Sequence, residues 1–226
     1  MTRILVLLAA GCTAATLPPI HQAPPAPRCI ATIDASGRSG SNGIDGANGA
    51  AGPVTGARGY DGEAGDSGGP GDPGPTVDVA LGMIGASSVA RITADRHFKR
   101  DVVLDPTCPP VTILARGGDG GAGGDGGNPG RGGTSARHVR ALAGPSGDVG
   151  DGGDGGNGGR GGRVVVRYDE RYPELLARIA IDNRGGSAGG GGAGRNARAA
   201  GDAGSDGPDG PAPEYLPVAP SAVFLP

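Results

Sequence analysis

Residues 117–133 read GGDGGAGGDGGNPGRGG, and residues 147–162 repeat the pattern as GDVGDGGDGGNGGRGG. A looser copy, GGSAGGGGAG, occupies residues 185–194. A flexible linker has no reason to keep a period, whereas these runs place about two glycines in every three residues. Three residues per turn is the repeat of an extended left-handed helix that makes no internal hydrogen bonds. The period therefore predicts extended helices whose backbone groups pair with neighbouring segments.

The triplet composition indicates how such helices would pack. Two of the three faces carry no side chain, so neighbours can approach on both, and N–H···O bonds between segments replace an apolar core. The two long runs are predicted to lie antiparallel as one layer. A disordered glycine-rich tract is the alternative, because glycine loses more conformational entropy on folding than any other residue. The third face carries the soluble residues Asp119, Ala122, Asp125, Asn128, Asp151, Asp154, Asn157 and Arg160.

One part of these runs resembles known proteins. The stretch GGDGGNGGRGG at 152–162, followed at once by Arg163-Val164-Val165-Val166, resembles the polyglycine-II helices that open into strands in the glycine-rich N-terminal domain of Obg-type GTPases. It also resembles the repeats of snow-flea antifreeze proteins. The resemblance implies helices of this type, and it implies no GTPase activity because the sequence lacks the phosphate-binding motif GxxxxGK[ST].

The composition restricts the fold class. The 226 residues include 50 Gly and 21 Pro but no Trp, two Phe and four Tyr, so only a small apolar core is possible. Such a composition is typical of repeat or collagen-like proteins. The formal net charge of −3 gives no polybasic signal for nucleic acid. We expect a mainly β and irregular fold with very little α-helix, in which a bundle of polyglycine-II helices adjoins a small antiparallel β unit.

The N-terminus predicts export. A short basic start precedes an apolar stretch at 4–10, and Ala9-Ala10-Gly11-Cys12 resembles a bacterial lipobox. The resemblance implies lipidation of Cys12 and a membrane anchor, and Thr13 in place of Asp favours the outer membrane or cell surface. An ordinary secretory signal with a chance cysteine is the alternative. With the glycine-rich runs and the lipobox taken together, the chain resembles a bacterial glycine-rich, collagen-like lipoprotein.

Glycine also recurs at every third position from Gly37 to Gly52 and from Gly56 to Gly74, on either side of a break at 53–55. This G-x-y pattern resembles bacterial collagen-like segments. Few of its x and y positions are proline and the break interrupts it, so single-chain helices are favoured over a homotrimer, with disorder as a third alternative.

Short β-branched runs separated by turn residues predict a small antiparallel β unit at 76–116. We expect further strands at 163–168 and 178–183, one helical turn at 172–178 and an edge strand at 223–225. The sequence then divides into a signal peptide (1–11), a lipidated cysteine with a proline-rich tether (12–36), a collagen-like segment (37–75), the β unit (76–116), GGX runs with intervening strands (117–210) and a proline-rich tail (211–226).

Several motifs in the sequence resemble chemical sites but lack the residues that the chemistry needs. Residues 65–70 read GDSGGP, a serine-protease signature, but only His21 precedes Ser67 and it lies in the tether. Carboxylates three residues apart on such a helix are separated by about 9 Å, too far to share one calcium ion. The RGG triplets alternate with Asp and lack aromatic partners for RNA. We expect no enzyme activity, no cofactor, no metal site and no nucleic-acid partner.

The two other cysteines form a candidate disulfide. If Cys12 is lipidated, Cys29 and Cys108 remain, and an exported compartment permits them to pair. Two unpaired thiols are the alternative.

The function predicted from the sequence is that of a non-enzymatic exported lipoprotein, a structural or adhesive scaffold at the cell surface. A membrane is its expected partner through the lipid anchor, with extracellular matrix or carbohydrate as possible ligands. The first alternative is an adhesin whose loops bind carbohydrate or a receptor. The second is a collagen-like homotrimer.

Overall fold

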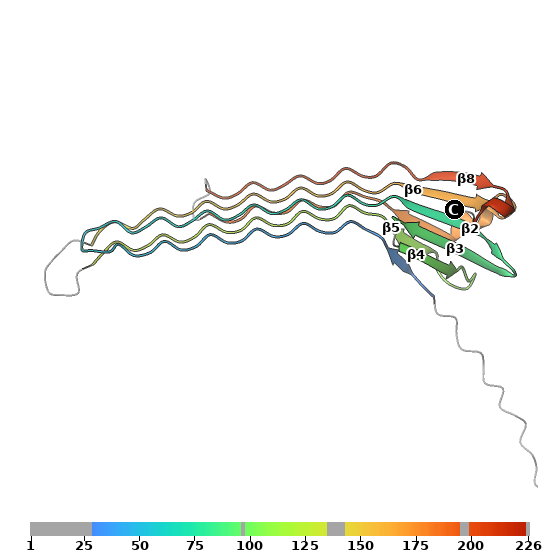
Figure 1. Ribbon diagram of the computed structural model, residues 1–226, viewed down its shortest axis with the longest axis horizontal. Coiled ribbons are helices and arrows are strands. Elements are labelled where there is room, and N and C mark those ends of the chain that lie inside the picture. The colour runs from blue at the N-terminus through green and yellow to red at the C-terminus, as the bar shows by residue number, and fades with distance from the viewer. Residues whose placement is uncertain (1–28, 96–97, 135–142, 195–198, 225–226) are drawn as a thin grey trace, which may run out of the picture.

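The computed structural model describes residues 29–95, 98–134, 143–194 and 199–224. Two β-sheets and two short 3₁₀ helices lie at one end of the molecule, which we call the base. Long extended segments leave the base side by side and form a rod (Figure 1). The far end of the rod is called the tip.

The rod consists of glycine-rich segments that carry no regular helix or strand assignment. We number them in chain order and keep these names throughout. They are run 1 (37–52), run 2 (57–74), run 3 (116–133), run 4 (144–162), run 5 (184–194) and run 6 (199–210).

The chain repeats one unit, in which a strand leads out along a run and a second run returns to a second strand. Three strands lead out, and each return ends in a strand of the other sheet (Figure 1). The outgoing strands are β1 (Thr32–Asp34), β5 (Val111–Leu114) and β7 (Ile179–Asp182), and the returning strands are β2 (Val77–Ile84), β6 (Val164–Asp169) and β8 (Glu214–Val218). Two further strands, β3 (Ser87–Ala94) and β4 (Phe98–Val103), follow β2.

The two sheets continue directly into the rod. The outgoing strands form a parallel sheet of order β1-β5-β7, and the returning strands belong to a sheet of order β4-β3-β2-β6-β8. Thr32 pairs with Thr112 in the strands, and Asn42 bonds Ala122 in the runs, so both pairs are 80 residues apart. The strand register is therefore carried unchanged into runs 1 and 3.

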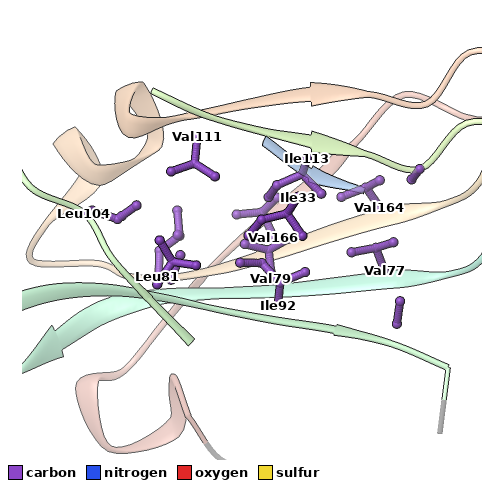
Figure 2. Packing of buried hydrophobic residues seen from close by; sticks show 14 of the residues in the cluster. Ile33, Val77, Val79, Leu81, Ile92, Leu104, Val111, Ile113, Val164 and Val166 are labelled. Carbon is purple, nitrogen blue, oxygen red and sulfur yellow. The ribbon is translucent and has the colours of Figure 1, made fainter. Parts of the chain in front are cut away.

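The apolar core lies between the two sheets at the base. In β2 the residues Val77, Val79 and Leu81 point inward, as the alternation of the sequence VDVALGMI requires. They belong to one cluster with Ile33 on β1 and Ile113 on β5, and Figure 2 shows Val79 near the middle of this cluster. The 3₁₀ helix η1 (Pro173–Arg178) connects β6 to β7 and adds the buried Leu175 to this core.

The structure confirms a mainly β and irregular fold with almost no helix, and it corrects three local predictions. The 76–116 unit is not one antiparallel sheet, because β2 pairs in parallel with β6 and β5 joins the other sheet. The predicted tether (12–36) includes β1, whose Ile33 is buried in the core. In the tail, β8 is the edge strand, whereas Val223 follows the 3₁₀ helix η2 (Pro220–Ala222) and is buried.

Within the described ranges, no helix has both the length and the apolar character needed to cross a bilayer.

Candidate functional site

Backbone hydrogen bonds hold the runs together in two layers. Runs 1, 3 and 5 form one layer and runs 2, 4 and 6 the other. Within a layer, one amide of each triplet donates to the run two places later, as in Gly43 N to Ala122 O at 2.7 Å and Gly123 N to Gly190 O at 2.9 Å. Between the layers, a second amide donates to the preceding run, as in Gly124 N to Asp66 O at 2.8 Å. The two long runs, 3 and 4, are antiparallel neighbours of this second kind, so they lie in different layers and not in the single layer that the sequence predicted.

Glycine is required because the runs touch at their backbones. A Cβ added to Gly118 would lie 1.9 Å from the carbonyl oxygen of Arg38 in run 1. A Cβ on Gly117 would lie 1.9 Å from the carbonyl oxygen of Gly159 in run 4. Runs 3 and 4 have neighbouring runs on both sides within their layers and carry two glycines in most triplets, as does run 5, whereas runs 1, 2 and 6 carry mostly one. The two interior runs are thus free of side chains on two faces.

Runs 5 and 6 end partway along the rod (Figure 1). Two residues that stand in place of glycine, one in run 3 and one in run 4, mark this level. The last amide of run 3 that donates to run 5 belongs to Gly126, and the next equivalent position is Pro129, which has no N–H. The first amide of run 4 that donates to run 6 belongs to Gly152, and the equivalent position before it is Val149. The GGX pattern is therefore interrupted in run 3, and begins in run 4, at the level where the neighbouring run ends.

The Asp and Asn residues on the outer faces have a structural role that the sequence analysis missed. Their Oδ1 atoms accept hydrogen bonds from the remaining backbone amide of a neighbouring run. Asp45 Oδ1 accepts from Asp125 N at 2.9 Å, and Asp125 Oδ1 accepts in turn from Ala193 N at 2.7 Å. The other acceptors of this kind are Asn42, Asn48, Asp61, Asp119, Asp154, Asn157, Asp206 and Asp209.

Both lateral margins of the bundle carry side chains that block a further run. In run 4, the residues that donate to the preceding run are glycines such as Gly150, whose Cβ would meet Glu63 O in run 2 at 1.8 Å. In run 2, the residues whose amides donate to run 1 in the same way include Glu63 and Asp66. Their side chains occupy the space in which a further run would pack. At the opposite margin, the Asp206 and Asp209 side chains accept hydrogen bonds from the backbone amides of run 5 that face outward, so these amides are not available to a further run. The packing pattern therefore ends with this chain.

A charged cluster lies where β7 passes into run 5. The Asp182 carboxylate accepts hydrogen bonds from Arg184 at 2.9 and 3.0 Å and also from Arg116. These two guanidinium groups, with Arg184 first, hold the pKa of Asp182 far below its ordinary value. A shallow depression of about 410 Å³, lined by Asp34, Arg116 and Arg184 among others, opens beside the cluster. The Arg–Asp–Arg arrangement ties runs 3 and 5 to the sheet below them.

The predicted site residues have different outcomes. Cys12 lies outside the described residues. A disulfide joins Cys29 to Cys108, with their Cα atoms 5.5 Å apart, and ties the chain before β1 to the loop between β4 and β5. Within the described ranges, no group of three or more His, Cys, Asp or Glu side chains could hold a metal ion.

The protease-like motif is explained by packing. Ser67 is exposed on run 2, and a Cβ on Gly65 or Gly68 would lie 2.1 or 2.0 Å from a carbonyl oxygen of run 3. The glycines of GDSGGP are therefore contact positions between runs. All three histidines, His21, His97 and His138, lie outside the described residues.

The turn that joins runs 1 and 2 lies at the tip. The break in the G-x-y register at 53–55 is a turn that ends at Gly56, whose φ of 76° favours glycine. The Val54 side chain on this turn is 66% exposed. Arg58 pairs with Asp148 of run 4 at 2.6 Å and with Asp61 at 3.2 Å, which holds the turn against the neighbouring run.

Searches of protein families, of characterised proteins and of solved structures found no match to this chain.

Proposed function

We propose that the chain is a non-enzymatic scaffold displayed at the cell surface, in which runs 1–6 form a rigid rod of polyglycine-II helices. The amide ladders between runs carry this proposal, because they recur every three residues and pass through contacts that exclude a Cβ. Runs of this length would give a rod of about 50 Å. Because the amides of run 1 donate to run 3 of the same chain, a single-chain rod is favoured over a collagen-like homotrimer.

We also propose that the base faces the membrane. The first described residue, Cys29, is held at the base by its disulfide, and the runs lead away from it (Figure 1). A lipid on Cys12, joined to the base through the proline-rich tether, would therefore leave the tip pointing away from the envelope. An outer-membrane or cell-surface location and a membrane partner belong to this proposal.

Display can be tested with the full chain expressed in a Gram-negative host. An epitope is inserted between Val54 and Thr55, and intact cells are labelled with antibody. We expect the antibody to label cells whose protein carries the native Cys12. When Cys12→Ser is introduced, we expect the protein to disappear from the membrane fraction. An epitope that is reached only after the cells are lysed would contradict outward display.

Rigidity can be tested by limited proteolysis of the same cells, using two matched substitutions. A valine at Gly124 would place its Cβ 2.2 Å from the Ile44 carbonyl oxygen, whereas Ala122 is exposed on the outer face. We expect Gly124→Val to open the runs to cleavage and Ala122→Val to remain as resistant as the wild type. Equal cleavage of all three proteins would contradict a packed rod.

An adhesive tip is a second candidate, and the exposure of Val54 favours it. In this case a carbohydrate or receptor would contact the turn at 53–56. Val54→Asp should then reduce the binding of cells to the ligand, whereas Ile44→Asp, at an exposed position on the side of the rod, should not. Equal loss with both variants would argue against a site at the tip.

A further inference from the structure

The outer face of the five-stranded sheet, opposite to the core, becomes apolar with distance from the rod. Its side chains lie in rows that cross β2, β3 and β4. The two rows nearest the runs contain Asp78, Thr93 and Lys99 in the first and the ion pair Arg91–Asp101 in the second. The third row consists of Gly82, Val89 and Val103. On this face of the three strands, charged side chains are therefore confined to the half next to the rod.

The hairpin between β2 and β3 forms the far end of this face. Residues 83–88 read MIGASS and carry no charge. The turn consists of Gly85, whose φ is 62°, and Ala86, and both are exposed together with Ile84, which is 48% exposed. Turns in contact with water usually carry polar residues. The composition of this turn therefore indicates a partner that is less polar than water.

The segment after η2 completes the apolar end of the base. The Phe224 ring packs over Gly82, where an added Cβ would lie 3.2 Å from it. Val89 lies between Gly82 and Val103 in the register and is only 6% exposed, whereas Val103 is 65% exposed. We use the name apolar patch for Ile84, Gly85, Ala86, Val103 and Phe224.

The chain enters the base at the same end. Cys108 lies in the loop that follows β4 and Val103, and the disulfide holds Cys29 against this loop. The preceding residues, 13–28, span at most about 55 Å when fully extended. A lipid on Cys12 would therefore keep the apolar patch within this distance of the bilayer.

A second feature of this end suits a membrane surface. In the turn after β6, the guanidinium carbon of Arg171 lies 5.4 Å from the centroid of the Tyr172 ring. Long cationic and aromatic side chains are favoured at the boundary between membrane and water, because their apolar parts enter it while their polar ends stay hydrated. The residue types at this end of the base are therefore those of an interfacial surface.

We propose that the apolar patch contacts the lipid bilayer and inserts into the boundary between head groups and acyl chains. The polar rows of the sheet then stay in water, and the rod points away from the membrane. This inference rests on the proposed function, because the lipid on Cys12 brings the chain to the bilayer. The patch supplies the second attachment that a single anchor needs to be stable, and it fixes the direction of the rod.

The contact is tested with single tryptophans, because the chain contains none of its own. Ile84→Trp places one in the patch, and Ile44→Trp places one on the side of the rod, where Ile44 is 73% exposed. The full lipidated chain is reconstituted in phosphatidylcholine vesicles whose acyl chains carry bromine, which quenches tryptophan on contact, and in the same vesicles without bromine. Denaturation midpoints close to the wild type verify that the variants are folded.

We expect bromine to quench Ile84→Trp at least about threefold more than Ile44→Trp, because an inserted apolar surface lies ~5–10 Å inside the boundary. In the Ile84→Trp chain, Val103→Asp should reduce this quenching by about half or more, because a carboxylate resists leaving water. The matched change Ile44→Asp should leave the quenching as it is.

The outcomes that contradict the proposal can be told apart. Equal quenching of both reporters in a chain that floats with the vesicles would overturn the contact but leave the lipid anchor intact. Shielding of the Ile84→Trp reporter that ignores bromine and grows with protein concentration would assign the patch to a second copy of the chain. A native chain that does not float with the vesicles would overturn both the anchor and the contact.

Discussion

At the scale of single residues, the rod depends on which positions face a neighbouring backbone. Gly189 and Gly190 are adjacent in run 5 but differ completely in their surroundings. A Cβ on Gly189 would lie 2.0 Å from the carbonyl oxygen of Gly121, whereas a Cβ on Gly190 meets nothing within 4 Å. Only the first of these glycines is needed for packing.

This difference gives a direct prediction for alanine substitutions. Gly189→Ala should lower the free energy of unfolding by about 1–3 kcal/mol, because the added methyl group must push two runs apart. Gly190→Ala should leave it unchanged or raise it by up to about 1 kcal/mol, because alanine restricts the unfolded chain. Chemical denaturation of the two variants measures the difference. Equal midpoints would show that the contact at Gly189 is not maintained in solution.

The outer-face carboxylates permit a second residue-scale prediction. Asp125→Ala removes the acceptor of the Ala193 amide, and exchange of that amide with solvent deuterium should become faster. Asp125→Asn keeps an Oδ1 acceptor and should preserve slow exchange. The expected cost of the alanine variant is about 0.5–1.5 kcal/mol. If both variants exchange like the wild type at Ala193, this side-chain bond does not contribute to the rod.

At the scale of elements, the charged cluster between β7 and run 5 makes stability depend on pH. Arg184 and Arg116 lower the pKa of Asp182 below its ordinary value of 3.8. A carboxyl group with a lowered pKa in the folded state stabilises it above its unfolded pKa, and this contribution is lost as the pH falls. We expect the denaturation midpoint of the wild type to drop more steeply below about pH 4 than that of Asp182→Asn. Glu63→Gln, at an exposed site on run 2, is the control and should follow the wild type; parallel curves for all three would contradict this role of Asp182.

The element scale also shows what sequence reasoning can and cannot reach. The period of three located the runs, and the short β-branched segments within 76–116 indicated the strands there. The partners of the runs were not predictable, because the offset of 80 residues between Asn42 and Ala122 depends on the lengths of everything between them. The strand β1 has only three residues and follows a proline-rich stretch, so its local signal was too weak to detect.

The outer-face pattern contained a signal that could have been used. Asp or Asn occupies every third position from 42 to 48 in run 1 and three of the four such positions from 119 to 128 in run 3, and this matched spacing would have indicated that one run bonds to the other. Treating these residues only as soluble ones on the outer face overlooked the backbone amides that still need an acceptor between runs. Pro129 and Val149 likewise mark the level at which runs 5 and 6 end. This could be inferred only after it was known that run 3 lies beside run 5 and run 4 beside run 6.

At the scale of the whole molecule, the blocked margins predict that the rod does not grow sideways. Glu63 and Asp66 lie where another run would pack at one margin, and Asp206 occupies an outward amide at the other. We expect light scattering to give the mass of one chain over a wide concentration range, with the slow sedimentation of an elongated particle. A mass of three chains would contradict this and restore the collagen-like trimer.

The alignment of the strands with the runs has a mechanical consequence. A force that pulls the tip away from the base acts along the rod, across the direction of the hydrogen bonds between runs. Such a force loads the ladders in shear, so many bonds must fail together, whereas peeling would break them one after another. Any partner held at the tip would therefore pull along the direction in which the rod resists force most. The same rod would yield far more easily if its runs were peeled apart from the side.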